Sequence, residues 1–161
     1  MIIIVEGIDR IGKTTLCNKL SQKTNIPIYK HKKSNYSEMK NDIETDVMIQ
    51  LIDLYKLLNG NIIFDRFHWS DFVYGALERN YSIANAYNNI NIIESKLKDN
   101  AIIIYVKPTN INKSSNEHGS DLTQYNALMN LLAKYTILKK YECTFNTIDN
   151  IIEEVINECR L

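Results

Sequence analysis

The chain has 161 residues, of which 45% are hydrophobic, and it carries 19 basic and 19 acidic side chains. This length fits one domain of common size, and the balanced charge excludes the strongly basic surface of proteins that coat nucleic acid. We find no apolar run long enough to span a membrane, no secretory leader and no metal-ligand spacing among the three cysteines, so we expect reduced thiols in a cytoplasmic protein.

An apolar, β-branched run at Ile2–Val5 leads directly into a glycine-rich segment, Gly7–Thr15. The segment has the spacing Gly-x-x-x-x-Gly-Lys-Thr, and a helical pattern follows over Lys13–Gln22. A strand, this loop and a helix in that order predict a phosphate-binding loop for a nucleoside triphosphate. Lys13 is expected to reach the β- and γ-phosphates, and Thr14 to ligate Mg²⁺. The loop comprises Gly7, Ile8, Asp9, Arg10, Ile11, Gly12, Lys13, Thr14 and Thr15.

Beyond this loop, apolar strand-like runs alternate with helical patterns, which is typical of βαβ units. Further strands are expected at Pro27–Lys30, Asn61–Asp65, Ala101–Val106 and Cys143–Asn146. Further helices are expected at Ile43–Leu58, Ser70–Glu78, Ile83–Lys98, Leu122–Lys140 and Asn150–Cys159. We therefore predict a single α/β domain over residues 1–161, with a five-stranded parallel sheet flanked by helices on both faces.

Two polar stretches interrupt this pattern. Pro108–Asp121 is rich in Asn, Ser and Lys and has no apolar period, which is typical of a lid over a site. A basic run covers residues 30–33 after the second strand. It supplies either point charges for an acceptor phosphate or a solvated turn.

The third strand ends in an acidic and a basic residue, Asp65 and Arg66. Ligands of an open parallel sheet bind at the carboxyl ends of its strands, so this pair is expected to share a crevice with the phosphate loop. Asp65 is expected to hold magnesium through water or to orient the attacking group, and Arg66 to bind phosphate as a planar fork. The alternatives are a salt bridge between the two side chains or a helix N-cap.

These motifs resemble those of thymidylate kinase and its deoxynucleoside monophosphate kinase relatives, which have the fold of P-loop nucleoside monophosphate kinases. The resemblance covers Glu6–Thr15 and Asp65–Gly75. It implies that Asp9 contacts the deoxyribose 3′-hydroxyl and that Arg66 binds the acceptor monophosphate. It also implies that Asp65 serves the magnesium ion and the acceptor oxygen.

The helix after the Asp-Arg pair is expected, by the same resemblance, to line the nucleoside pocket. Ser70 begins this helix, Asp71 faces the base, and Tyr74 crowds the 2′ position of the sugar. The stretch 29–46 lacks the arginines with which the family reads the base, so the identity of the base is left open. Tyr55 is expected either to stack on the base or to pack in the core.

Arg10 assigns the chain to a subtype within this resemblance. Related kinases carry catalytic arginines either on the lid or in the phosphate loop, and here the expected lid contains Lys113 and His118 but no arginine. Arg10 is therefore expected to neutralise charge on the transferred phosphoryl group. The alternative is a solvated charge at the tip of the loop.

Several other residues near these motifs have two interpretations. Three aromatic residues are spaced either for stacking on a base or for packing against the sheet, namely Phe67, Trp69 and Phe72. His68 is expected to have a structural or solvent role. The resemblance implies a homodimer through apolar residues around Phe72, Ile49 and Leu128, although a buried core would use the same residues.

We predict an enzyme that uses ATP and Mg²⁺ to phosphorylate a deoxynucleoside 5′-monophosphate, with dTMP as the leading acceptor. Its catalytic residues are expected to be Arg10, Lys13, Asp65 and Arg66. One alternative is a deoxynucleoside kinase, which needs a carboxylate base that we do not find after Ile28. Others are a polynucleotide 5′-hydroxyl kinase, which the neutral charge disfavours, and an inactive nucleotide-binding module. The expected partners are small nucleotides, without membrane or nucleic acid.

Overall fold

The computed structural model of the chain describes residues 1–30, 41–79, 81–109 and 122–160. Five parallel strands form one sheet in the order β2-β3-β1-β4-β5, which confirms the predicted sheet. The strands are β1 (Ile2–Glu6), β2 (Ile28–Lys30), β3 (Ile62–Asp65), β4 (Ala101–Lys107) and β5 (Lys139–Thr144). β1 is the central strand, so the segment that follows it begins at the middle of the row of strand C-terminal ends.

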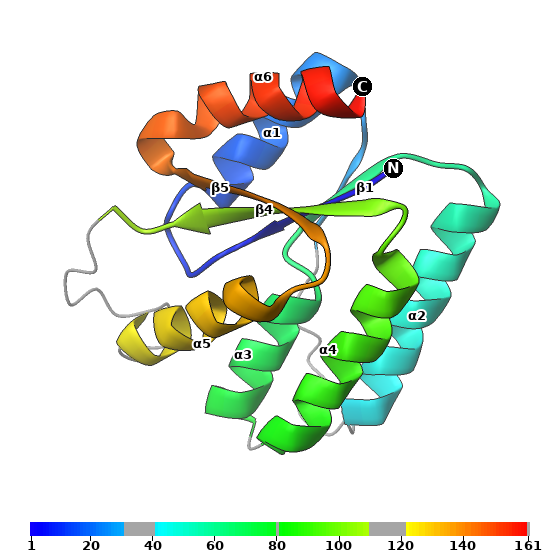
Figure 1. The fold of residues 1–161 in the computed structure, drawn as a ribbon, viewed down its shortest axis with the longest axis vertical. Helices are drawn as coiled ribbons and strands as arrows, with labels where there is room; N and C mark the ends of the chain where they lie inside the picture. The colour runs from blue at the N-terminus through cyan, green and yellow to red at the C-terminus, as the bar shows by residue number, and fades with distance from the viewer. Residues whose placement is uncertain (31–40, 80, 110–121, 161) are drawn as a thin grey trace.

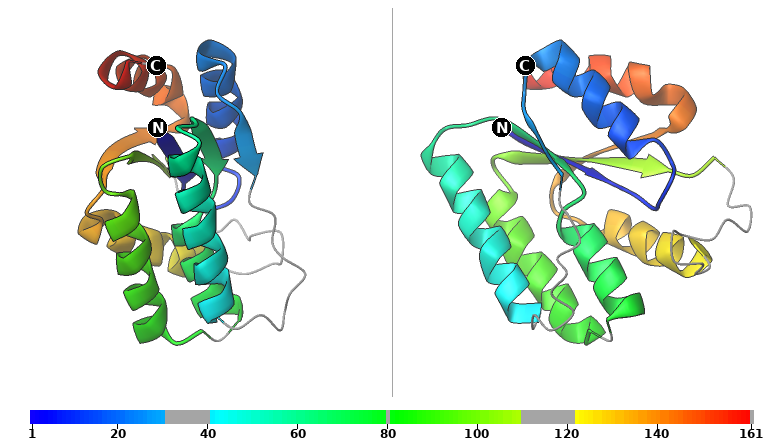
Figure 2. Two further views of the ribbon diagram at one scale, coloured as in Figure 1. Left: turned by 90° about the vertical axis from the view of Figure 1, so that its right-hand side faces the viewer. Right: turned by 180° about the vertical axis from the view of Figure 1, so that it is seen from behind.

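Helices cover both faces of this sheet, as predicted (Figures 1 and 2). One face is covered by α1 (Lys13–Thr24) and α6 (Ile148–Cys159). The other face is covered by α2 (Asn41–Leu57), α3 (His68–Glu78), α4 (Ile83–Leu97) and α5 (Leu122–Tyr135). A short 3₁₀ helix, η1 (Phe145–Thr147), joins β5 to α6. None of the described helices has the length and apolarity to cross a membrane.

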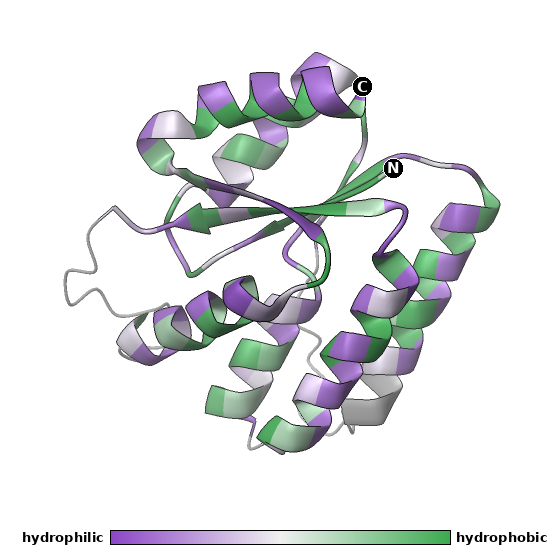
Figure 3. Ribbon diagram, in the orientation of Figure 1, coloured by the Kyte–Doolittle hydropathy of each residue, from purple (hydrophilic) through white to green (hydrophobic). Residues whose placement is uncertain are grey.

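The central strands supply side chains to two separate cores. In β1, Ile2 and Ile4 pack beneath α2–α5, whereas Ile3 and Val5 pack against α1 and α6. Side chains alternate along a strand, so a strand buried on both faces needs a continuous apolar run rather than an alternating one. Figure 3 shows hydrophobic colour along β4 and hydrophilic colour on the outward faces of several helices, whereas much of β5 is hydrophilic.

The last strand differs from the prediction. The helix before it ends at Tyr135 instead of Lys140, and β5 begins at Lys139 instead of Cys143. β5 lies at the edge of the sheet, and its residue Tyr141 is buried while Lys139 and Glu142 are exposed. Charged side chains are common on an edge strand, but they also fit the exposed face of a helix. The predicted helix is therefore too long at its C-terminal end.

The aromatic residues of the second motif pack in the core. Phe67 stacks on Phe64 with ring centroids 4.5 Å apart, and Trp69 meets Tyr105 edge-on at 5.9 Å. Phe72 is 4% exposed and belongs to the same core. These three residues therefore pack in the core and are not exposed for stacking on a base. Because Phe72 is buried, it offers no surface for contact with a second copy of the chain. The homodimer stays a prediction.

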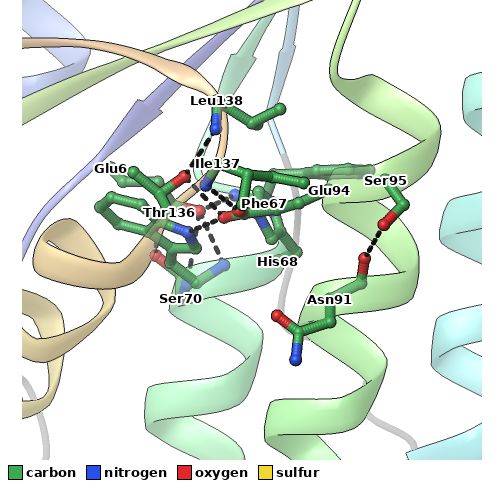
Figure 4. Close-up of polar contacts among 11 residues, drawn as sticks. Glu6, Phe67, His68, Ser70, Asn91, Glu94, Ser95, Thr136, Ile137 and Leu138 are labelled. Carbon is green, nitrogen blue, oxygen red and sulfur yellow. Dashed lines mark hydrogen bonds and ion pairs between the residues drawn. The ribbon is translucent and has the colours of Figure 1, made fainter.

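A buried carboxylate, Glu94 of α4, joins three segments beside the start of α3 (Figure 4). One oxygen accepts hydrogen bonds from the indole N–H of Trp69 and the hydroxyl of Thr136, both at 2.9 Å. The other accepts the backbone N–H of Ile137 at 2.9 Å, and the Nε2 atom of His68 lies 3.3 Å from the carboxylate. Burial raises the pKa of Glu94, but these contacts more than offset it and leave the pKa below its usual 4.5. His68 thus has a structural role.

Replacing Glu94 by glutamine should lower the free energy of unfolding near pH 7 by about 2 kcal/mol, because a neutral amide accepts these donors less well. The folded-state pKa lies below the unfolded one, so the carboxylate stabilises the fold above about pH 4.5 and loses this effect as the pH falls through the folded-state pKa. The difference between the two proteins should therefore shrink in acid. Chemical denaturation across this pH range measures it.

The control is Glu153→Gln, which removes an exposed carboxylate that pairs with Lys23 on the surface. This change should alter stability by less than about 0.5 kcal/mol. Equal effects of the two substitutions would show that the Glu94 contacts do not stabilise the fold.

Candidate functional site

A tight loop, residues 7–12, connects the end of β1 to the start of α1 at Lys13. Gly7 has a φ of 144° and Gly12 a φ of 99°, angles that residues with a Cβ rarely adopt. A Cβ on Gly7 would lie 2.5 Å from the carbonyl oxygen of Val106, and one on Gly12 would overlap the ring of Phe145. Both glycines of the motif are therefore required by backbone angle and by packing.

The Lys13 side chain lies inside this loop. It is 4% exposed, and its amine donates a hydrogen bond to the backbone carbonyl of Ile8. Burial lowers the pKa of Lys13 to about 8, although the charges of Asp9 and Asp65 partly oppose this shift. The amine is therefore a largely desolvated cation at neutral pH, which favours the approach of an anion.

The two residues predicted to hold magnesium are in direct contact. The Thr14 hydroxyl, in the first turn of α1, donates to Asp65 Oδ2 at 2.8 Å, and Asp65 is buried at the end of β3. Mg²⁺ prefers oxygen ligands and usually keeps several waters beside one or two protein groups and substrate phosphates. In the described ranges no group of three or more His, Cys, Asp or Glu gathers as a metal cage. The pair therefore fits magnesium held jointly with phosphate and water.

Arg66 joins the loop to α3. Its guanidinium pairs with the Asp9 carboxylate of the loop and donates to the Tyr74 hydroxyl at 3.0 Å. Burial raises the pKa of Asp9, but the bond and charge of Arg66 outweigh it and hold the pKa below its usual value. Burial also raises the pKa of Tyr74. The Asp9–Arg66–Tyr74 cluster thus contains an anion, a cation and a neutral hydroxyl, and Arg66 pairs with Asp9 rather than with Asp65.

Two other predicted substrate contacts have partners within the protein. Ser70 is buried, and its hydroxyl donates to Glu6 Oε2 at 2.5 Å. Asp71 accepts a hydrogen bond from Arg79 Nη2 at 2.6 Å, and the Arg79 guanidinium also lies over the ring of Tyr81 at 4.6 Å. The Ser70 hydroxyl therefore contributes to packing at the start of α3, whereas the Asp71 carboxylate is held in place by a cation.

The remaining predicted residues lie apart from these contacts or outside the described ranges. Arg10 has a φ of 60°, and its side chain is exposed at the tip of the loop. Tyr55 meets the ring of Phe64 edge-on at 6.1 Å and packs against the core. The basic residues at 31–33 and most of the predicted lid, residues 110–121, fall outside the described part of the chain. Their roles stay predictions.

Two charged residues beside the site, Glu6 and Arg79, have no role that was predicted from the sequence. Glu6 is fully buried at the end of β1, and its hydrogen-bond partners begin 61 residues later in the chain. A carboxylate at the end of a buried apolar strand is expected to have a hydrogen-bond donor or a cation as its partner. The neighbouring sequence does not indicate which residue this partner is. Arg79 follows α3 and reaches back along it to Asp71, which helical spacing did not indicate.

The fold is that of the P-loop nucleotide kinases. Thymidylate kinase from Ehrlichia chaffeensis superposes with a TM-score of 0.64 at 13% identity, covering 97% of this chain and 98% of that one. Deoxyadenosine kinase from M. mycoides with bound dATP superposes with a TM-score of 0.60 at 18% identity, over the full length of both chains. At these identities the likeness establishes the fold and leaves the substrate open.

The chain is also similar to the SPbeta prophage-derived uncharacterized protein YorR of Bacillus subtilis (strain 168). The two are 29% identical over 136 residues, which cover 83% of this chain and 79% of YorR. A crystal structure of YorR in complex with phosphorylated GDP superposes with a TM-score of 0.79 at 26% identity, covering all of this chain and 96% of that one. No protein-family model matches the chain.

Replacing Lys13 by methionine should stabilise the nucleotide-free protein by about 2 kcal/mol near pH 7, because burying a charged amine costs free energy. The folded-state pKa of about 8 lies below the ordinary 10.5, so the unfolded chain binds more protons between these values. The gain should therefore be full below pH 8 and fade towards pH 10.5. Thermal and chemical denaturation at several pH values measure it.

The matched control is Lys19→Met on the same helix, where the amine is exposed and pairs with Asp149. This change should shift stability by less than about 0.5 kcal/mol. A Lys13→Met protein that is less stable than wild type would show that the buried amine contributes more through its bond to Ile8 than its desolvation costs.

Proposed function

We propose that the protein is an ATP-dependent kinase that transfers the γ-phosphoryl group to a deoxynucleoside 5′-monophosphate. The observation that carries this proposal is the ion pair between Asp9 and Arg66. It places a guanidinium suited to phosphate directly beside the loop suited to a triphosphate, with the contact between Thr14 and Asp65 at the same end of the sheet. A donor phosphate and an acceptor phosphate would thus be held close together.

The proposed reaction follows from these positions. The loop N–H groups and Lys13 hold the β- and γ-phosphates, while Thr14 and Asp65 would hold Mg²⁺, which supplies charge neutralisation on the phosphates when bound. Arg66 binds the acceptor monophosphate, whose oxygen is already anionic at neutral pH and needs no general base. This oxygen attacks the γ-phosphorus, the bond to the β–γ bridging oxygen breaks, and ADP leaves.

The arrangement favours a monophosphate over a free nucleoside as the acceptor. A neutral 5′-hydroxyl requires a carboxylate base within hydrogen-bond reach. Within the described ranges, the carboxylates beside the loop already have side-chain partners, since Asp65 accepts a bond from Thr14, Asp9 pairs with Arg66 and Glu6 accepts a bond from Ser70. Arg66 beside them would also bind a charged acceptor phosphate more strongly than a neutral hydroxyl.

Two acceptor bases have support from different observations. Thymine follows from the resemblance of the sequence motifs to thymidylate kinases. Guanine has support from YorR, which binds phosphorylated GDP, and from Asp71, which Arg79 holds in place. A carboxylate accepts two hydrogen bonds side by side, and guanine offers adjacent N–H donors at N1 and N2, whereas thymine offers one N–H between two carbonyl groups.

The proposal is tested with one panel of acceptors and wild-type protein, following ADP release from ATP. The panel contains dTMP, dGMP, dCMP, GMP, UMP, thymidine, deoxyguanosine and a 5′-hydroxyl oligonucleotide. We expect dTMP or dGMP to give the highest kcat/KM and the nucleosides and oligonucleotide to give none. Phosphorylation of a nucleoside or oligonucleotide with every monophosphate inert would contradict the proposal.

Tyr74 is expected to exclude ribonucleotides, because its half-buried ring would meet a 2′-hydroxyl and leave that hydroxyl without a partner. Tyr74→Ala should therefore raise kcat/KM for GMP or UMP relative to the deoxy acceptor by about tenfold or more. Tyr74→Phe keeps the ring and loses only the contacts of the hydroxyl with Arg66 and Asp9, so it should keep the sugar preference. Equal behaviour of the two variants would remove this role from the ring.

Arg10→Ala should lower kcat by about a hundredfold or more while leaving the affinity for ATP nearly unchanged, if its exposed guanidinium meets charge that develops during phosphoryl transfer. Lys113→Ala, in the predicted lid, is the comparison and should have a much smaller effect. Single-turnover rates and ATP titrations separate the two quantities. A dominant effect of Lys113 would overturn the assignment of the catalytic cation to the loop.

A further inference from the structure

The carboxylate of Glu6 lies at the N-terminus of α3 (Figure 4). Its Oε1 atom accepts backbone N–H groups from Phe67 at 2.9 Å, Trp69 at 3.1 Å and Ser70 at 3.3 Å, and Oε2 accepts the Ser70 hydroxyl. The first N–H groups of a helix have no partner within the helix, and negative charge is favourable there. Glu6 therefore explains why α3 begins at His68, before the predicted start.

The same contacts fix the backbone on both sides of Arg66. Arg66 has a φ of 73°, in the left-handed region that costs a residue with a side chain roughly 1–2 kcal/mol. Its own N–H donates to the carbonyl of Val5 at 3.0 Å, and the next N–H, that of Phe67, donates to Glu6. Such a conformation persists only where the surroundings hold it, and here β1 supplies both acceptors.

Glu6 also directly precedes Gly7, the first residue of the phosphate loop. The strand that delivers the loop therefore ends in the side chain that holds the turn carrying Arg66. From this turn, Arg66 reaches Asp9 and Tyr74. The buried carboxylate of Glu6 thus links the strand that delivers the loop to the turn that carries Arg66.

We propose that Glu6 is a positioning residue for the acceptor phosphate. It does not touch substrate; it acts by holding Arg66 in the left-handed conformation that aims the guanidinium beside the phosphate loop. This inference rests on the proposed function, because it assigns a phosphate ligand to Arg66.

If Glu6 only stabilised the fold, its replacement would change stability without changing how the acceptor phosphate is held. Glu94 provides a matched control for this comparison. Glu94 is also a buried carboxylate that binds the start of α3, through Trp69 and His68, but it contacts neither peptide group beside Arg66. Glu6→Gln and Glu94→Gln both remove a buried charge from the same helix terminus. Only the first should change how the acceptor phosphate is held.

The experiment is steady-state kinetics with ATP and the best monophosphate from the panel. Glu6→Gln should raise the KM for the acceptor by about tenfold, a loss within the range that small misplacements cause, and change the KM for ATP by less than about twofold. Glu94→Gln should change neither KM, although it lowers thermal stability. In an Arg66→Ala background, adding Glu6→Gln should raise the acceptor KM no further.

Melting temperatures confirm that each variant is folded, and Glu6→Asp, whose shorter side chain retracts the carboxylate, replaces Glu6→Gln if the latter does not fold. Equal shifts of both KM values, the same acceptor effect from Glu94→Gln, or full additivity with Arg66→Ala would overturn the inference while leaving the proposed function intact. If wild-type protein phosphorylates no monophosphate, the proposed function itself is wrong and the role of Glu6 falls with it.

Discussion

The ion pair between Asp9 and Arg66 joins two segments that lie 57 residues apart in the chain, and the arrangement of the site depends on it. Asp9 belongs to the loop after β1, and Arg66 belongs to the turn after β3. These strands pair in parallel with Val5 opposite Asp65, so both segments leave the sheet at the same edge. Parallel pairing therefore brings the charges together, and their ion pair fixes the distance between the two candidate phosphate sites.

The groups at this edge are held in states that cost free energy. Lys13 is a buried cation, Arg66 and Arg10 have left-handed backbone angles, and Glu6 is a buried carboxylate. Strained and desolvated groups persist only when a rigid scaffold holds them. The scaffold here is a sheet whose central strands are buried on both faces. The two hydrophobic cores on these faces supply the free energy that offsets the unfavourable states at the site.

Two buried carboxylates hold the start of α3 from opposite sides. Glu6 binds the first N–H groups of the helix from β1, while Glu94 binds side chains of its first turn from α4 and reaches the segment after α5. Charged acceptors with several donors stabilise the start of the helix, but of the two only Glu6 binds a peptide group beside Arg66, so only Glu6 sets the position of Arg66 relative to the loop.

The sheet, the loop and the order of most elements could be predicted from the sequence, because a strand buried on both faces needs a continuous apolar run and a phosphate loop needs glycines at fixed spacing. The sequence also predicted that Asp65 lies beside the loop, because the carboxyl ends of parallel strands meet at one edge of the sheet, and Asp65 contacts Thr14 there. The predicted start of β5 is four residues late, because the charges of this segment suit an edge strand and a helix equally, and the partners of Glu6, Asp71 and Glu94 were not predicted. The folded arrangement is needed to find these partners, because a buried charge is paired by groups close in space, and the partners of Glu6 and Glu94 are 25 or more residues away in the chain.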